Sequence, residues 1–517
     1  MALFYRDDVY RLKPLCMMAL GPCKTHTPGK RTTMSQTNPE ITRMFINGSW
    51  VEAVAGTTRP VINPADEAAV GVVAYGGRAD AELAIDAAAR ALPDWRKRTA
   101  NDRAQILKRA ADLIRQKADS LARTLTLEQG KPLPEARGEV LMAADTFEWF
   151  AEEGKRAYGR TIPAPHPLKR QMVLKQPVGV VGTITPWNFP AALPARKIAP
   201  ALAAGCTVVS RPADQTPLVL AGIFGCLQEA GLPAGAANLV IGDAVTVADA
   251  FFERQEIRKI SFTGSTAVGK QLLRRSADRL IKLSLELGGS APLIIFPDAD
   301  VEAVARFAVQ GKFRNNGQVC IAPSRFFVHE SVRAGFTEAA VELTRRLKMG
   351  SGLDDGVQVG PMIEPRFVEN AKRLIEDARR HGATVLTGGN RPARFEKGYF
   401  LEPTVVDKVD RSMALLTEEP FAPIMPILGF DQFEAMLAEA NNTPYGLAAY
   451  VFTNDLTTAT RMAEGLDAGI IGINDPVPTS VNAPFGGMKE SGLGRELGQE
   501  GLEAYLETKF VSIGLRP

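Results

Sequence analysis

The chain has 517 residues, 45% of them hydrophobic and 23% charged, a composition typical of folded globular proteins and not of disordered ones. Its 61 Lys and Arg nearly balance its 58 Asp and Glu, which argues against a protein that binds nucleic acid through a broadly basic surface. Only four histidines occur, far apart in the chain, so no metal site built on several histidines is expected. At about 150 residues per domain, the length allows roughly two to four domains.

The five cysteines are too few and too scattered for a disulfide framework, and their odd number fits a reducing compartment. We therefore expect a cytoplasmic protein in which one thiol is free to react. The longest uncharged stretch, residues 176–195, contains four prolines and predicts a strand, a turn and a helix start instead of a membrane span. We expect no membrane partner.

The amino-terminal segment lacks clear periodicity. It contains basic residues together with Asp7 and Asp8, a mixture that fits neither a transit peptide nor a secretory signal. We expect residues 1–43 to form a disordered extension. Folded sequence is expected to begin near Met44, where an apolar run leads into an Asn47-Gly48 turn.

Helical spacing of apolar residues predicts helices over 102–129 and 135–157. From residue 177 onward strand and helix patterns alternate, which indicates βαβ units and a parallel sheet. The expected strands are 178–185, 206–210, 238–241 and 259–263, and the expected helices are 192–204, 217–231, 244–254 and one from 266. Such sheets bind ligands at the carboxyl ends of their strands.

A second alternating series begins after Gly288-Gly289, where we place a domain boundary. Its expected strands are 292–296 and 325–329, and its expected helices are 300–314 and 331–348.

The run Gly264–Lys270 lies between a predicted strand and a predicted helix and has the spacing of a phosphate-binding P-loop. Gln271 follows it, however, where a P-loop needs a hydroxyl for magnesium. Two interpretations stay open: a helix N-terminus that holds a phosphate, and a tight turn without a ligand.

Three residues could carry chemistry. Cys320 follows a polar, glycine-containing run, whereas Cys206 and Cys226 have apolar neighbours typical of the core; a structural thiol is the alternative for Cys320. Because histidines are few, we expect a carboxylate base, and Glu286 ends a predicted strand before two glycines; a solvated strand face is its alternative. Asn188 follows the first parallel strand and could donate to an oxyanion or cap the turn.

Six segments together resemble the aldehyde dehydrogenase superfamily, and similarity extends over residues 45–515. The segments are Thr185–Pro190, Ser261–Gly269, Glu286–Gly289, Asn316–Cys320, Glu418–Pro423 and Pro484–Gly498. The resemblance implies an α/β fold in three parts and a homodimer or homotetramer. The parts are a Rossmann-type parallel-sheet cofactor domain (44–155 and 178–289), an α/β catalytic domain (290–499) and a small oligomerisation element (156–177 and 500–517).

The resemblance also implies a mechanism. The thiolate of Cys320 attacks an aldehyde, the Asn188 side chain and the Cys320 amide hold the oxyanion, and hydride passes to a nicotinamide. Glu286 then activates water to hydrolyse the thioester. The implied cofactor-binding residues are Trp187, Arg211, Asp214, Gly264, Ser265, Gly269, Leu287, Glu419 and Phe421.

Two positions depart from the family pattern. Arg211-Pro212-Ala213-Asp214 stands where Lys-Pro-Ser/Ala-Glu (or Ser) is usual, at the adenosine ribose. Asp214 should repel a 2′-phosphate and so favours NAD, whereas the Arg211 fork could bind that phosphate; we expect NAD and leave NADP open. Ala422 stands where Gly is usual, and we expect a small effect.

Within the family the chain looks most like succinate-semialdehyde dehydrogenases. Arg196 and Arg314 match the arginines that grip the distal carboxylate of the substrate in that subgroup, and Ser480 matches its serine contact; structural ion pairs are the alternative for the arginines. Ala322 replaces the second cysteine of a redox switch found in some members, so we expect no such switch.

We therefore expect oxidation of succinate semialdehyde to succinate with NAD(P)+. Glutarate or 2-oxoglutarate semialdehyde, or a broad range of aliphatic aldehydes, are alternative substrates. A P-loop nucleotide hydrolase and a non-catalytic protein of the same fold are alternatives of other classes.

Overall fold

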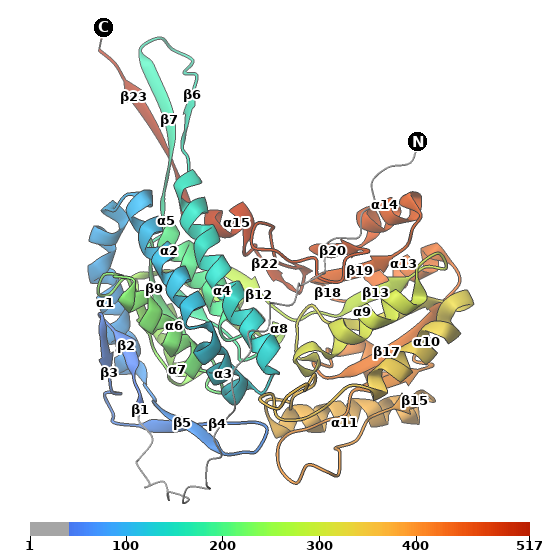
Figure 1. Ribbon diagram of the computed structural model, residues 1–517. Coiled ribbons are helices and arrows are strands. Elements are labelled where there is room, and N and C mark those ends of the chain that lie inside the picture. Colours follow the sequence, from blue (N-terminus) through green and yellow to red (C-terminus); the bar gives the residue numbers. More distant parts are fainter. Residues whose placement is uncertain (1–40, 517) are drawn as a thin grey trace, which may run out of the picture. The chain divides into compact units, whose positions relative to one another are not determined.

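The computed structural model describes residues 41–516 (Figure 1). Most of the predicted extension, residues 1–40, lies outside this range. β1 (Ile41–Thr42) pairs in parallel with β5 (Ala69–Ala74), so regular structure is present before Met44. The predicted turn is confirmed: Asn47 and Gly48 have φ values of 52° and 80° and join β2 (Met44–Ile46) to β3 (Ser49–Val51) in an antiparallel hairpin.

The predicted parallel sheet is confirmed as the central part of an eight-stranded sheet with the order β22-β12-β11-β8-β9-β10-β2-β3, whose first strand is β22 (Gly492–Leu493). Its parallel strands are β8 (Val180–Ile184), β9 (Thr207–Arg211), β10 (Ala237–Leu239), β11 (Ile257–Thr263) and β12 (Lys282–Glu286). The helices between them are α5 (Ala192–Ala204), α6 (Leu218–Glu229), α7 (Ala244–Glu253) and α8 (Thr266–Ser276). These bounds lie within a few residues of the prediction, because short apolar strands and glycine-terminated helices leave clear local signals.

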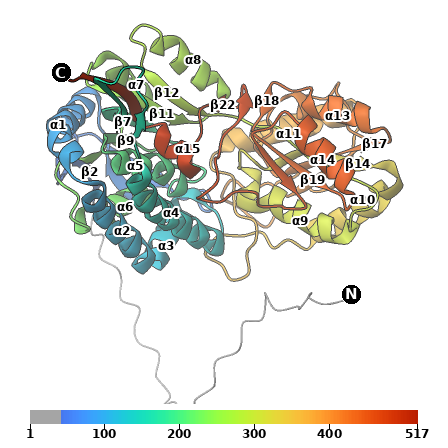
Figure 2. The same cartoon turned by 90° about the horizontal axis from the view of Figure 1, so that it is seen from above.

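Four helices precede this sheet in the chain: α1 (Arg78–Lys97), α2 (Ala100–Gln116), α3 (Ala118–Gln129) and α4 (Leu133–Glu153). Figures 1 and 2 show α1 to α7 gathered around the eight-stranded sheet. The prediction of one helix over 102–129 is wrong. Lys117 leaves helical geometry (φ −95°, ψ 11°), and α3 starts immediately after it as a separate helix. Both halves bury an apolar face, so the periodicity did not reveal the break.

A seven-stranded sheet with the order β15-β16-β17-β14-β13-β19-β20 follows after residue 290, as the second alternating series predicts. Its strands are β13 (Ala291–Ile295), β14 (Pro323–His329), β15 (Thr384–Thr387), β16 (Thr404–Asp407), β17 (Ile424–Phe430), β19 (Ala448–Phe452) and β20 (Ile470–Ile473). Helices α9 (Val301–Phe313), α10 (Glu330–Arg345), α11 (Pro365–Arg380), α13 (Phe433–Asn441) and α14 (Leu456–Gly465) accompany it. The α/β fold class is thus confirmed.

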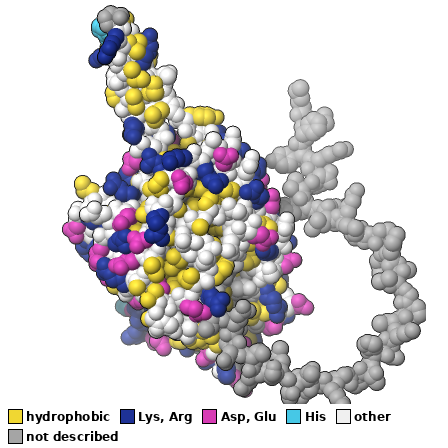
Figure 3. Space-filling model, turned by 90° about the vertical axis from the view of Figure 1, so that its left-hand side faces the viewer, with side chains coloured by type: hydrophobic (Ala, Val, Ile, Leu, Met, Phe, Trp, Pro, Cys, Tyr) yellow, Lys and Arg dark blue, Asp and Glu magenta, His cyan; other side chains and the backbone are white. Residues whose placement is uncertain are grey.

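A third, antiparallel sheet projects from the eight-stranded part (Figure 1). It consists of β6 (Arg160–Ile162), β7 (Lys169–Pro177) and β23 (Leu506–Gly514), with β7 and β23 paired along their full lengths. Apolar side chains of Leu174, Phe510 and Ile513 are 42 to 56% exposed, and Figure 3 shows hydrophobic side chains along this arm.

Two further findings concern residues 41–516. No helix there is both long and apolar enough to cross a membrane. No three His, Cys, Asp or Glu side chains there come together as they would around a metal ion.

A buried ion pair ties α4 to the start of α5. The carboxylate of Glu139 accepts hydrogen bonds from the amides of Ala191 (2.8 Å) and Ala192 (3.2 Å), at the N-terminus of α5. Its other oxygen accepts from the Lys131 ammonium at 2.6 Å, and both side chains are almost fully buried. The Lys131 ammonium also donates to the Asn188 carbonyl oxygen at 2.8 Å.

Glu139→Gln is expected to lower the free energy of unfolding by about 3–5 kcal/mol, because the Lys131 ammonium is left buried without its counter-charge. The double variant Lys131→Met/Glu139→Gln is expected to lose less, since it buries no lone charge. Urea denaturation of both variants measures the difference. A double variant as unstable as Glu139→Gln, or less stable than it, would contradict the buried-charge explanation.

Candidate active site

Three neighbouring parallel strands end at the same edge with unsatisfied polar groups. Glu286 ends β12, Thr263 ends β11 and Thr185 follows β8. Within residues 41–516 the Thr185 and Thr263 hydroxyls and one Glu286 carboxylate oxygen are buried without a hydrogen-bond partner. Buried polar groups are normally paired, so this edge is suited to a polar ligand.

Glu286 is only 4% exposed, so its alternative as a solvated strand face is wrong. Burial raises the pKa of its carboxyl well above the usual range, and the nearby Glu496 carboxylate raises it further. Lys197 and Arg196 act in the opposite direction. A carboxylate with a raised pKa takes up a proton more readily than an exposed one, which is the property that a general base needs.

Two glycines of the predicted Pro484–Gly498 motif pack closely against Glu286. A Cβ atom on Gly486 would lie 2.7 Å from a Glu286 carboxylate oxygen, and φ at Gly486 is 154°. β22 (Gly492–Leu493) pairs antiparallel with β12 and places Gly492 opposite Glu286. Only glycine allows these two approaches.

Cys320 follows a turn in which Asn315, Asn316 and Gly317 all have positive φ (48°, 53° and 73°). Asn and Gly tolerate this left-handed conformation better than other residues. The same turn meets the Gly288-Gly289 pair, because a Cβ on Gly289 would lie 2.5 Å from the Cys320 carbonyl oxygen. Cys206 and Cys226, in contrast, are fully buried in the core, as predicted.

The charges of four groups affect the pKa of the Cys320 thiol. Burial raises its pKa to about 12; the Arg196 and Arg314 guanidiniums act to lower that pKa, and the Glu419 and Glu286 carboxylates act to raise it. The structure therefore brings Cys320 together with Glu286 and with both predicted arginines.

The Asn188 side chain lies at the same turn. Its amide nitrogen donates to the Gln318 carbonyl oxygen at 3.1 Å, which leaves one amide hydrogen available for an oxyanion. Its backbone carbonyl accepts from Lys131 at 2.8 Å and from the Asn315 side chain at 2.9 Å. These bonds hold Asn188 in place.

Neither predicted substrate arginine forms an ion pair with any residue of the described range 41–516. Arg196 is 7% exposed, lies 4.4 Å from the centroid of the Phe485 ring, and has a buried Nε without a partner. Arg314 lies 5.6 Å from the centroid of the Phe189 ring and borders a cavity of about 490 Å³. Ser480 is exposed and donates to Asn482, and the structure does not join it to the arginines.

The predicted cofactor residues lie on five segments of the chain, at or after the ends of β8, β9, β11 and β12 and before β17. Ser265 caps α8, and a Cβ on Gly269 would lie 2.5 Å from the Leu287 side chain, so glycine lets α8 approach the end of β12. Glu419 accepts from the Gly289 amide at 3.1 Å, and burial raises the pKa of its carboxyl to about 7.

The Trp187 ring packs edge-on against Phe421 at 5.6 Å. Together with the unsatisfied Thr185 and Thr263 hydroxyls and the N-terminus of α8, these loops fit a dinucleotide. Arg211 and Asp214 bind each other. Lys270, the lysine of the P-loop-like run, pairs with Glu490 at 2.7 Å.

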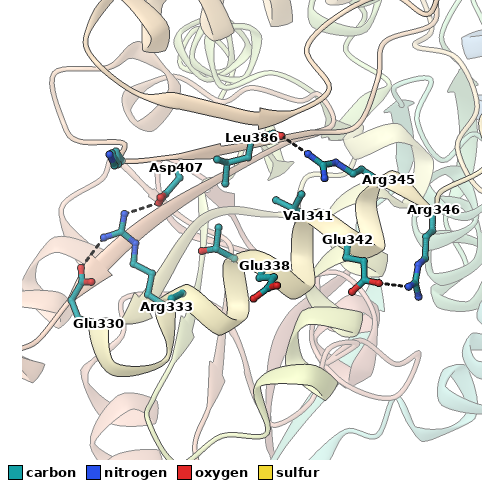
Figure 4. A pocket seen from close by; sticks show the side chains of 12 residues that line it. Glu330, Arg333, Glu338, Val341, Glu342, Arg345, Arg346, Leu386 and Asp407 are labelled. Carbon is teal, nitrogen blue, oxygen red and sulfur yellow. Dashed lines mark hydrogen bonds and ion pairs between the residues drawn. The ribbon is translucent and has the colours of Figure 1, made fainter.

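A cavity of about 920 Å³ on α10 is a different feature (Figure 4). Arg333 pairs there with Glu330 and Asp407, and Arg346 pairs with Glu342. None of the predicted site residues lines it, and most of its charges are already paired.

Comparison with known proteins decides the family. A model of the aldehyde dehydrogenase family matches residues 50–511. This chain belongs to the aldehyde dehydrogenase family. It is 46% identical over 471 residues to the NADP(+) succinate-semialdehyde dehydrogenase of Escherichia coli, and 45% identical over 471 residues to a glutarate-semialdehyde dehydrogenase of Pseudomonas putida. Each alignment covers 91% of this chain and 97% of the relative.

The fold agrees with that membership. A crystal structure of betaine aldehyde dehydrogenase from Staphylococcus aureus in complex with NAD+ superposes with a TM-score of 0.90. Its sequence is 38% identical, and the match covers 92% of this chain and 95% of that structure. An aldehyde dehydrogenase fold with a cofactor site for NAD(P) is therefore present in this family member.

Two charged residues near Glu286 were not predicted. Lys197 and Glu496 form an ion pair, with side chains 0% and 3% exposed, and the Lys197 ammonium also lies 3.3 Å from the Ser261 hydroxyl. Lys197 and Arg196 are the only charged residues of α5, an otherwise apolar helix. Two adjacent charges in such a helix could have indicated a functional role from the sequence. Lys312, buried in α9 near Glu419, offered no such signal.

Gly289→Ala is expected to lower kcat about 100-fold, because its Cβ would displace the Cys320 carbonyl and with it the thiol. Gly311→Ala is the matched control, since no atom lies within 4 Å of a Cβ at that position in α9. Steady-state kinetics and thermal melting of both variants provide the test. Equal activity in the two variants would show that the Gly289 approach does not set the position of Cys320.

Alkylation of Cys320 by iodoacetamide is expected to accelerate about tenfold per pH unit from pH 6 to 9, because its pKa of about 12 keeps the thiolate fraction rising throughout. Arg196→Met removes a cation that favours the thiolate, so it should slow alkylation at every pH. Mass spectrometry identifies the alkylated cysteine. A plateau below pH 8, or an unchanged rate in Arg196→Met, would contradict this electrostatic description.

Proposed function

We propose that this protein oxidises succinate semialdehyde to succinate with NAD(P)+. The observation that supports it best is the pair of guanidiniums, Arg196 and Arg314, which form no ion pair with any residue of 41–516 and whose charges act on Cys320. Guanidinium groups bind carboxylates through paired hydrogen bonds, so they would hold the distal carboxylate of a semialdehyde while its aldehyde meets the thiol. The activity named for the Escherichia coli relative is the same.

The chemistry follows from the residues around the thiol. The Cys320 sulfur bonds to the aldehyde carbon, and the new oxyanion receives hydrogen bonds from the Asn188 amide and the Cys320 backbone N–H. Bound NAD(P)+ supplies the acceptor for the hydride that leaves this carbon. A thioester then remains on Cys320. Glu286 takes a proton from water, whose oxygen attacks the thioester carbon, and the acid leaves as the thiol is restored.

The residues that would hold the cofactor are the predicted ones. The N-terminus of α8, from Gly264 to Gly269, is suited to the pyrophosphate. We assign Glu419, whose charge acts on Cys320, together with Phe421 and Trp187 to the nicotinamide side, and Arg211 with Asp214 to the adenosine side.

Glutarate semialdehyde, one methylene longer, is the second candidate substrate, because the Pseudomonas putida relative is named for it. The same two arginines would bind its carboxylate.

The larger organisation is also a proposal. We assign cofactor binding to 44–155 and 178–289, catalysis to 290–499, and homodimer or homotetramer formation to 156–177 and 500–517. Exposed Leu174, Phe510 and Ile513 on the β7–β23 arm support the last assignment. The free Cys206, Cys226 and Cys320 thiols suit the reducing cytoplasm.

The test compares kcat/KM for succinate semialdehyde, glutarate semialdehyde and butanal. Succinate semialdehyde should be preferred over butanal by about 100-fold or more. Arg314→Met should lower kcat/KM for both semialdehydes about 100-fold and change that for butanal only a few-fold, because butanal has no carboxylate to bind. Arg137→Met, on the exposed face of α4, is the control and should match the wild type.

Preference for butanal in the wild type would contradict the proposed substrate. Equal losses on all three aldehydes in Arg314→Met would contradict the role of this arginine in binding the carboxylate.

A further inference from the structure

Asp214, predicted to disfavour NADP, lies between two guanidiniums. One of its carboxylate oxygens accepts from Arg211, and the other accepts from Arg59 at 2.6 Å and from the Tyr75 hydroxyl at 3.1 Å. Arg59 comes from β4 (Thr58–Ile62), far from Asp214 in the sequence, and its guanidinium also lies over the Tyr75 ring at 5.3 Å.

Two guanidiniums, Arg59 and Arg211, hold the one Asp214 carboxylate, and the Asp243 carboxylate also acts on Arg211. Burial and the neighbouring Asp214 raise the pKa of Tyr75, so its hydroxyl stays neutral and donates. The carboxylate that alone would repel a phosphate is therefore already engaged by guanidinium groups.

The two arginines differ in their freedom to move. Arg211 is 6% exposed and is fixed by two hydrogen bonds to the Gly242 carbonyl oxygen, at 3.0 and 2.9 Å. Arg59 is 44% exposed, and its only carboxylate partner within residues 41–516 is Asp214. Its side chain borders a cavity of about 510 Å³ that is also lined by Asp214, by the paired Arg366 and Glu364, and by Glu369. Arg59 thus has room to bind an added anion beside Asp214.

We propose that Arg59 is a specificity-determining residue that, with Arg211, binds the 2′-phosphate of NADP. The inference rests on the proposed use of NAD(P) and on the placement of Asp214 at the adenosine ribose. Both Asp214 oxygens already accept hydrogen bonds. A 2′-phosphate that approaches Asp214 therefore meets the N–H groups of its arginine partners and not an unpaired carboxylate. Guanidinium groups bind phosphate through two parallel hydrogen bonds.

The test measures the binding of cofactor fragments by calorimetry, without any turnover. The wild type should bind 2′,5′-ADP more tightly than 5′-AMP, since only the former carries the 2′-phosphate. Arg59→Gln should weaken 2′,5′-ADP about tenfold or more and leave 5′-AMP within twofold. Arg59→Lys keeps the charge but loses the planar fork, so its affinity for 2′,5′-ADP should lie between those of the wild type and Arg59→Gln.

Arg43→Gln is the matched control. Arg43 is 53% exposed and likewise has one carboxylate partner, Glu52, at 2.8 Å. It should leave both fragment affinities unchanged. Steady-state kinetics should show the same pattern, with kcat/KM for NADP reduced in Arg59→Gln and that for NAD retained.

Three results would overturn the proposal: equal affinity of the wild type for the two fragments, equal weakening of both fragments in Arg59→Gln, or the same weakening in Arg43→Gln. A protein that binds 2′,5′-ADP through Arg59 yet oxidises no aldehyde would contradict the proposed function and support this inference. The two failures are therefore distinguishable.

Discussion

Burial of the Glu286 carboxylate is the constraint on which the rest of the site depends. A parallel strand brings this group to the sheet edge, where Gly486 lies against its carboxylate and Gly492 pairs with its backbone. The Lys197 and Arg196 cations favour the ionised form of this enclosed carboxylate, and the Glu496 carboxylate opposes it. Because the same Arg196 reaches Cys320, the proton affinities of the base and the thiol are coupled through one guanidinium.

The elements that could be predicted from the sequence are those specified by local signals. The Asn47-Gly48 hairpin, the helix over 192–204 and the strand end at Glu286 all follow from neighbouring residues. The predicted helix over 102–129 was wrong because the break at Lys117 leaves the apolar periodicity intact. The burial of Glu286 could not be predicted locally, since a segment much later in the chain encloses it.

The pairing of charged residues could not be predicted from the sequence. Arg196 and Lys197 are neighbours in α5, yet Lys197 pairs with Glu496 while Arg196 keeps no carboxylate partner among the described residues. Asp214 in isolation indicates NAD, whereas in the fold both of its carboxylate oxygens are engaged by the guanidiniums of Arg59 and Arg211. In both cases the partner is distant in sequence, and its identity decides whether a charge stabilises the fold or remains available to a ligand.

The central claim is that Cys320 carries the substrate as a thioester which Glu286 then releases. The most direct measurement is a single mixing of the Glu286→Gln variant with succinate semialdehyde and NADP+, quenched in acid and digested for mass spectrometry. The mechanism predicts one equivalent of NADPH and one succinyl group on the peptide that contains Cys320. A full equivalent of NADPH with no acyl group on Cys320, or sustained turnover at the wild-type rate, would contradict it.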